Sequence, residues 1–171
     1  MGSEQFSCNT FVRSLRCYRK IALTPFLFLA AFPALAAFDL NEVKLGSSEQ
    51  ELKKRFPQAN CRPLEWASRA ADRRCDDSRV KLGGMEASVT FYLRKDAVEG
   101  FDMRFDKRNV EPMRKFLSGR YGTPAVTDQG DVKAEWKANG ERARMTAEQG
   151  RRRASLLVWR GAFEEELYKI R

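Results

Sequence analysis

Two segments of the chain, residues 86–93 and 154–159, alternate between apolar and polar positions. Such alternation is typical of a β-strand that buries one of its faces. A three-residue turn at 95–97 would fold the first segment back onto residues 101–105. The predicted hairpin pairs Phe91 with Phe101, Val89 with Met103 and Ala87 with Phe105, and it leaves Ser88, Thr90 and Tyr92 on the outer face.

A second hairpin is predicted around Asn139-Gly140, because both residues tolerate the positive φ angles of a tight turn. Its core face would carry Val132, Ala134 and Trp136 opposite Ala147, Met145 and Ala143. The other face would carry Lys133, Glu135, Lys137, Arg142, Arg144 and Thr146. After a turn near Gly150, the strand 154–159 would add Ser155, Leu157 and Trp159 to this charged face, beside Arg142 and Arg144.

Two helices are predicted from apolar residues spaced three or four apart. In the first, Ser48 and Glu51 have the spacing of a capping box, and Pro57 ends the helix. In the second, Asn109 is the expected cap and Gly122 the expected end. Its apolar stripe consists of Val110, Met113, Leu117 and Tyr121.

The order of these elements indicates an internal repeat. The sequence LKKRFPQA (52–59) aligns with LSGRYGTP (117–124), and LEW (64–66) aligns with AEW (134–136). The fold class expected is therefore α+β, with two α-β-β-β(-β) repeats at about 39–106 and 107–171. The end of the chain, 163–171, has helical spacing, but the repeat favours a strand that matches 98–105, and we expect a strand.

The sequences KLGSSEQELKKRFPQA and VEPMRKFLSGRYGTP, each followed by antiparallel strands, support a family resemblance. The chain resembles the tandem units of the beta-lactamase-inhibitor-protein-like fold, one unit of which occurs in outer-membrane assembly lipoproteins of the BamE (SmpA/OmlA) type. It looks most like small secreted proteins of proteobacteria. The resemblance implies helices packed on one face of an antiparallel sheet, with the other face free for proteins. The chain lacks a lipoprotein cysteine, so no functional residue is transferred.

The first 36 residues have the organisation of a secretory signal peptide. Residues 1–20 are polar and basic, residues 21–36 form a short apolar run, and Ala34-Leu35-Ala36 is a cleavage motif. Cleavage is expected between Ala36 and Ala37. A run of this length is short against the roughly 20 residues needed to span a bilayer. We therefore expect a periplasmic or secreted mature domain, 37–171, without a membrane span. The long basic region suggests an alternative start near Val12.

Only two cysteines, Cys61 and Cys75, remain after the predicted cleavage, and the chain has no histidine. Zinc would need more ligands, and a redox pair would normally be spaced C-x-x-C. An exported protein usually pairs such cysteines, so a disulfide is expected. A hairpin that turns at Ser68 would place them directly opposite each other, with Pro63 on an edge strand or at a bulge. Leu64 and Trp66 would then face away from the bridge, into the core.

The absence of histidine removes the usual nucleophile activation and the commonest general base. We therefore expect a protein that is not an enzyme and holds no cofactor or metal. The alternative is a cell-envelope enzyme that acts on an acidic glycan through paired carboxylates. The carboxylates considered are Glu65, Asp76, Asp77 and Glu135.

The expected function is the binding of a macromolecular partner. Residues 37–171 contain 28 basic and 22 acidic residues, a net charge of +6. After export the natural partners are acidic proteins and other envelope components rather than nucleic acid. The residues predicted to bind the partner are Lys137, Arg142, Arg144, Arg151, Arg152, Arg153 and Trp159. Two alternatives stay open: binding of anionic lipid, and burial of Trp159 under the C-terminal segment.

Overall fold

The computed structural model describes residues 37–65, 68–161 and 163. The predicted signal peptide with Ala36, the orientation of Trp66 and residues 164–171 of the strand expected over 163–171 lie outside these residues. Phe163, the described residue of that segment, is helical rather than extended. Among the described residues, no helix is long and apolar enough to cross a membrane.

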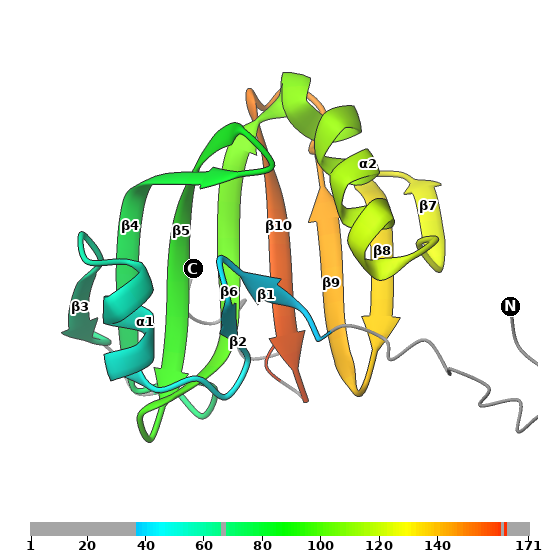
Figure 1. Cartoon of the computed structure of the whole chain (residues 1–171). Helices are drawn as coiled ribbons and strands as arrows, with labels where there is room; N and C mark the ends of the chain where they lie inside the picture. Colours follow the sequence, from blue (N-terminus) through cyan, green and yellow to red (C-terminus); the bar gives the residue numbers. More distant parts are fainter. Residues whose placement is uncertain (1–36, 66–67, 162, 164–171) are drawn as a thin grey trace, which may run out of the picture. The chain divides into compact units, whose positions relative to one another are not determined.

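The central element is an eight-stranded antiparallel sheet with the order β3-β4-β5-β6-β10-β9-β8-β7 (Figure 1). The fold is therefore α+β, as predicted. The strands are β3 (Asn60–Pro63), β4 (Arg73–Leu82), β5 (Met85–Arg94), β6 (Ala97–Asp106), β7 (Val126–Gln129), β8 (Val132–Ala138), β9 (Glu141–Thr146) and β10 (Arg153–Arg160). The edge strand β7 was not predicted.

The two predicted helices form, although only the first begins as expected. Helix α1 (Glu49–Arg55) has the predicted capping box: Glu51 N donates to Ser48 Oγ at 3.3 Å, and Ser48 N donates to Glu51 Oε2 at 3.0 Å. Before α2 (Val110–Tyr121) the chain already turns in a 3₁₀ helix, η1 (Lys107–Asn109). Asn109 therefore makes no capping hydrogen bond, and Asp106 caps η1 instead by accepting from Arg108 N at 2.9 Å.

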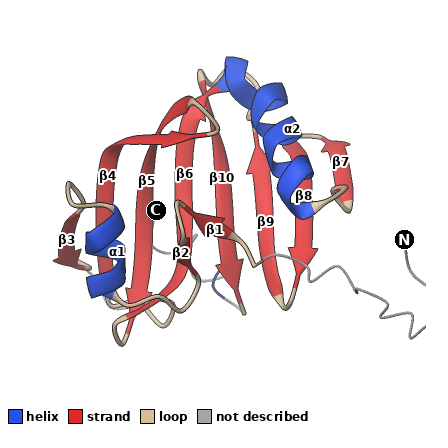
Figure 2. Ribbon diagram, viewed as in Figure 1, coloured by secondary structure: helices blue, strands red, loops and turns tan. Residues whose placement is uncertain are grey.

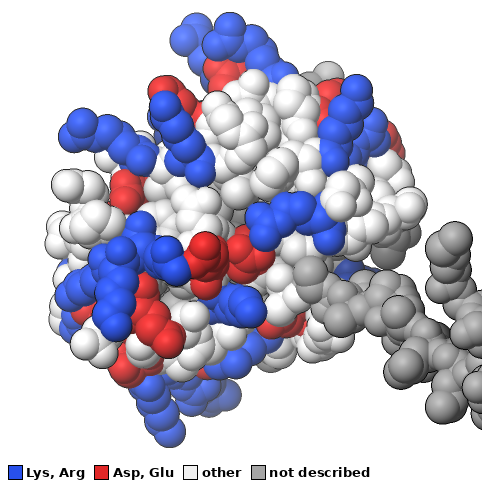
Figure 3. Space-filling model, in the orientation of Figure 1, with Lys and Arg blue, Asp and Glu red and all other residues white. Residues whose placement is uncertain are grey.

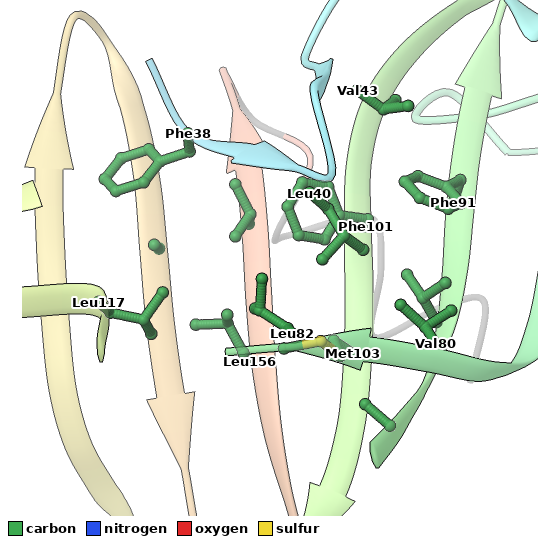
Figure 4. Close-up of a cluster of buried hydrophobic side chains, with 14 of the residues drawn as sticks. Phe38, Leu40, Val43, Val80, Leu82, Phe91, Phe101, Met103, Leu117 and Leu156 are labelled. Atoms are coloured by element: carbon green, nitrogen blue, oxygen red, sulfur yellow. The ribbon is translucent and has the colours of Figure 1, made fainter. Parts of the chain in front are cut away.

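Both helices cover the same face of the sheet (Figure 2). A short hairpin of β1 (Asp39–Leu40) and β2 (Val43–Lys44), which the sequence pattern did not reveal, lies between them on this face (Figure 1). Its Leu40 is completely buried and points into the same cluster as Phe101 and Met103 (Figure 4). The main core is thus closed by three separate elements.

The predicted strand registers are largely confirmed. Phe91 faces Phe101, Val89 faces Met103 and Ala87 faces Phe105. The turn has two residues rather than three, because Lys95 and Asp96 both adopt positive φ and a bulge near Tyr92 takes up the difference.

In the second hairpin, Trp136 faces Ala143 and Ala134 faces Met145, as predicted. A bulge between Val132 and Ala134 shifts the end of the ladder, so Val132 faces Thr146 instead of Ala147.

Cys61 and Cys75 form the predicted disulfide and face each other across β3 and β4. Pro63 lies on an edge strand, also as predicted. Leu64 faces away from the bridge, as predicted, but not into the main core: Cys75 belongs to the core beneath the helices, whereas Leu64 packs against a cluster on the opposite face. The reason is the alternation of side chains, which puts residues 61 and 64 on opposite faces once the bridge itself points to the core.

A helix followed by four strands occurs twice along the chain, and the strand order is mirrored about the β6–β10 pair. The predicted matching of strands is nevertheless shifted. β10 occupies the place that mirrors β6 rather than β5, because β7 adds a strand to the second half. The LEW and AEW motifs also differ in position, since Leu64 follows β3 whereas Ala134 and Trp136 lie within β8. A common origin of the two halves stays a prediction.

Candidate functional site

The outer face of the sheet, opposite the helices, carries a second small apolar cluster. It consists of Ala70, Ala71, Tyr92, Leu157, Trp159 and Phe163, with Leu64 packed against it. Trp159 lies on the predicted face, but it is only 1 % exposed, so the prediction of an accessible tryptophan is wrong. The rings of Tyr92 and Phe163 lie 5.3 Å apart. Phe163 is the first residue of the C-terminal segment. The alternative prediction, burial of Trp159 under this segment, therefore agrees better with the structure than an accessible tryptophan does.

Gly100 makes room for this cluster. A Cβ atom at this position would lie 2.9 Å from the ring of Phe163 and 2.9 Å from the carbonyl oxygen of Val158. Any larger residue would therefore force Phe163 away from the sheet. This packing explains why the tryptophan predicted for partner binding is unavailable.

Arg144 is engaged within the fold. Its guanidinium lies over the Trp159 ring at 5.3 Å and its Nε is 3.1 Å from Glu135 Oε2. Glu135 is itself buried, and Lys137 Nζ is 3.4 Å from its other oxygen. Arg144 and Lys137 thus compensate a buried carboxylate, which limits what either can offer a partner.

The remaining predicted basic residues do not form one patch. Arg142 lies opposite Lys137 on the neighbouring strand, beside the Asn139-Gly140 turn, and opposite Trp159 on the other side. Arg153 lies at the opposite end of β10, facing Asp106. Six residues of strand separate these positions, which corresponds to about 20 Å. Arg151, Arg152 and Arg153 therefore belong to a different region from Lys137 and Arg142.

The four candidate catalytic carboxylates do not form one site, although Glu65 and Asp76 both approach Arg62, at 3.9 and 3.8 Å. Asp76 on β4 and Glu135 on β8 are separated by five strand spacings, about 24 Å, whereas glycosidase pairs lie within about 10 Å. Burial by itself raises the pKa of Asp76, but hydrogen bonds from Arg74 and Thr90 outweigh it, so its pKa is lowered. Such a carboxylate is a poor proton donor near neutral pH.

Asp77 and Glu65 are also poorly placed for catalysis. Asp77 accepts a hydrogen bond from Arg79 N at 2.9 Å within its own strand, and Glu65 is exposed and 3.9 Å from Arg62.

Among the residues that the structure describes, one group of side chains has the proximity that a metal site needs: Glu49, Cys61 and Cys75. The two sulfur atoms are bonded to each other, so they cannot serve as thiolate ligands in this state.

The most distinctive feature of the described surface is a basic groove at one end of the sheet. Three adjoining hollows of about 810, 500 and 570 Å³ share Arg152 as a lining residue, and we call them together the arginine groove. Its basic lining residues are Arg79, Lys81, Arg104, Lys107, Arg108, Arg151, Arg152 and Arg153; its acidic ones are Glu86, Asp106 and Glu148. The groove thus carries a net charge of +5, against +6 for residues 37–171.

Three parts of the chain form the walls of the groove: the β4–β5 turn, η1 and the β9–β10 loop. Lys107 N donates to Arg152 O at 3.0 Å, and Lys107 Nζ donates to Glu148 O at 2.8 Å, so η1 is tied to the loop. The turn packs closely on α2, because a Cβ atom at Gly83 would lie 2.8 Å from the Phe116 ring. Figure 3 shows Lys and Arg side chains gathered at this upper edge, above the start of α2.

Several cations of the groove are uncompensated. Arg108 pairs with Asp106 at 2.8 Å and Arg151 with Glu148 at 3.3 Å. The hydrogen bonds from Arg108 lower the pKa of Asp106 to about 2, so this carboxylate stays ionised. Within the described part of the chain, no ion pair forms at Arg79, Lys81, Arg152 or Arg153. Unpaired charges of one sign around a hollow attract ligands of the opposite sign.

Sequence reasoning found the three arginines Arg151, Arg152 and Arg153 but missed the other five basic residues of the groove, which are Arg79, Lys81, Arg104, Lys107 and Arg108. A signal was available for Arg104, because the predicted register of β5 and β6 places it opposite Ser88 on the outer face. No local pattern joins the β4–β5 turn to η1 and the distant loop.

No protein-family model matches the chain, and comparisons with curated proteins and with solved structures find no match either. The geometry of the arginine groove is therefore the basis for proposing a function.

Proposed function

We propose that this protein is a non-enzymatic binding protein of the periplasm or the secreted fraction, and that its arginine groove binds an acidic protein. The observation that carries the proposal is the concentration of charge: a net +5 surrounds one set of hollows, and Arg79, Lys81, Arg152 and Arg153 have no ion-pair partner among the described residues. Such a surface accelerates the encounter with an anionic partner.

The proposed surface differs from the one that the sequence suggested. Arg151, Arg152 and Arg153 remain in it, joined by three arginines and two lysines from β4, β6 and η1. Trp159 is buried, and Arg144 is held by Glu135. Neither belongs to the proposed contact.

Export is supported by two features. Residues 21–36 form an apolar run that ends in the Ala34-Leu35-Ala36 motif. The Cys61–Cys75 disulfide is of the kind that persists in oxidising compartments. We include the signal peptide and the periplasmic or secreted location in the proposal.

We also propose that the two halves are diverged copies of one unit, as in the tandem BamE-like architecture. The supporting observation is the mirrored strand order about β6 and β10, with one helix ahead of each set of four strands. In this arrangement both helices lie on one face and leave the other face and its ends accessible to partners.

The experiment is a capture from envelope extract at low and high salt, with three immobilised proteins. Wild type is compared with Arg152→Ala/Arg153→Ala and with the control Lys137→Ala/Arg142→Ala, which removes the same charge about 20 Å away. At low salt we expect wild type and the control to capture the same discrete protein. The groove variant should not capture it. The captured protein, once purified, must reproduce this difference.

An equal loss of the captured protein in both variants would show that total charge, not the groove, is responsible, and full recovery by the groove variant would show that Arg152 and Arg153 do not contribute. Co-sedimentation with anionic vesicles without a captured protein would replace the proposal by lipid binding, and turnover of an acidic glycan would replace it by an enzyme.

A further inference from the structure

A row of hydroxyl groups flanks Arg104 on the outer face of the sheet. The strand registers place Ser88 on β5 opposite Arg104, Arg104 opposite Ser155 on β10, and Ser155 opposite Thr146 on β9. Directly opposed side chains have Cβ atoms about 4.5–5.5 Å apart. Arg104 therefore has a hydroxyl group within reach on each side.

Two of the three hollows of the arginine groove meet at this row. Arg104 and Arg153 line both the 810 Å³ and the 500 Å³ hollow, while Ser88 lines the first and Ser155 the second. Arg104 thus lies between the hydroxyl groups of Ser88 and Ser155, where the two hollows meet on the outer face.

Arg104 is held in place by a buried carboxylate. The side chain of Asp102, two residues earlier on the same strand, is 2 % exposed, and its Oδ2 accepts a hydrogen bond from Arg104 Nε at 3.3 Å. This contact uses one of the five N–H groups of the guanidinium. No described residue accepts a hydrogen bond from its two Nη groups, and the side chain is 53 % exposed. Arg104 is therefore fixed at its inner edge and accessible at its outer edge.

The neighbouring hydroxyl groups complete a set of donors. Ser155 Oγ and Thr146 Oγ1 are 2.8 Å apart and share one hydrogen bond, so one of their two protons remains to donate elsewhere. Arg153 precedes Ser155 by two residues and therefore lies on the same face of β10, which adds a second cation. The set comprises a two-pronged guanidinium, hydroxyl donors on both of its sides and a further positive charge.

We propose that Arg104, with Ser88, Ser155 and Arg153, forms a subsite for a phosphoryl group. A phosphate monoester has three acceptor oxygens and a charge of roughly −1.5 to −2 near neutral pH. Two oxygens suit the fork of Arg104, and the third suits a flanking hydroxyl group. A carboxylate has only two oxygens and would leave the hydroxyl groups unused. The subsite rests on the proposed function, since it names the anionic group that the groove recognises.

The first test is a calorimetric titration with inorganic phosphate and with phosphoserine at constant ionic strength, with acetate as the comparison anion. We expect saturable binding of both phosphates and weaker binding of acetate. Arg104→Gln should raise the dissociation constant about 10- to 100-fold, the range for a lost hydrogen bond to a charged group. Arg104→Lys keeps the charge but not the fork, and it should lose most of the same affinity. Ser155→Ala should lose less.

The matched control is Arg142→Gln, which removes another exposed arginine from the other end of the outer face and should leave the affinity within about twofold. Equal losses in Arg142→Gln and Arg104→Gln, or full retention by Arg104→Lys, would overturn the subsite in favour of a general charge effect. Absence of saturable binding by either phosphate would also overturn it. Unchanged thermal unfolding of Arg104→Gln confirms that the loss is local.

A second arm distinguishes the source of the group. Co-sedimentation with phosphatidic acid vesicles that Arg104→Gln abolishes would assign the subsite to a lipid headgroup; binding of phosphoserine without vesicle binding would assign it to a soluble monoester. Failure of the subsite is separable from failure of the proposed function. A captured acidic protein that still depends on Arg152 and Arg153 would keep the groove as its binding surface even if no phosphate binds.

Discussion

Replacing Trp159 by alanine should unfold part of the outer face rather than weaken binding selectively. The side chain is 1 % exposed and packs within the cluster that contains Tyr92, Leu157 and Phe163. Arg144 covers its ring at 5.3 Å. The substitution therefore removes the largest member of a small cluster and also uncovers a charged residue that it helps to position.

The magnitude follows from the burial. A buried tryptophan removes roughly 150–250 Å² from water, which corresponds to about 4–6 kcal/mol at about 25 cal/mol per Å². Alanine retains the Cβ atom, so about 3–5 kcal/mol is expected, the range observed for such truncations. For a domain of about 135 residues this lowers the melting temperature by about 10–18 °C. Trp159→Phe retains a ring and should cost clearly less.

The assay is thermal and urea unfolding of the purified protein, followed by circular dichroism. Arg142→Ala is the control, because Arg142 faces Trp159 across β9 and β10 but is exposed. Its melting temperature should change by less than about 2 °C, as is usual for surface substitutions. If Trp159→Ala also melts within about 2 °C of wild type, the outer cluster does not contribute as described and the tryptophan is accessible after all.

Three further predictions concern stability and ionisation. Replacing both bridged cysteines by serine should cost about 3 kcal/mol, measured by urea unfolding, because the disulfide closes a loop of about 15 residues; a midpoint equal to that of wild type would contradict this. Gly100→Ala puts a carbon atom 2.9 Å from the Phe163 ring and should destabilise the protein by about 1–3 kcal/mol. Gly119→Ala, which adds a carbon atom in open space on α2, should instead stabilise the protein by about 0.5–1 kcal/mol. The pKa of Asp106 is lowered to about 2 by its hydrogen bonds from Arg108. Its contribution to stability is therefore present above about pH 3.9, the ordinary pKa of the carboxyl group, and is lost as the pH falls through about 2. A carboxyl titration by NMR with a midpoint near pH 3.9 would refute this.

Strand pairing was the most predictable property of this chain, because a period of two residues specifies both the face and the register. The Asn139-Gly140 turn and the Phe91–Phe101 pair were correct for this reason. Bulges were not predictable, since each depends on one extra residue whose presence the alternation does not reveal. The hairpin formed by β1 and β2 was missed because each of its strands has only two residues.

The candidate site was less predictable than the fold. Alternation placed Trp159 on the correct face but did not show that Phe163 and Ala71 cover it. The arginine groove joins a turn, a 3₁₀ helix and a distant loop, which only the sheet order brings together. The arginines of the β9–β10 loop were visible as a run in the sequence. Arg104 was not singled out, because an isolated arginine on a strand is usually a solvated surface residue.

The most direct test of the central claim is to map where an acidic ligand binds. Backbone amide chemical shifts of the isotope-labelled protein should be followed while polyglutamate, and then the captured partner, is added. The account predicts the largest changes around Arg79, Arg104 and residues 152–155, with little change at 137–142. Changes concentrated at 137–142, around the Asn139-Gly140 turn, would contradict it.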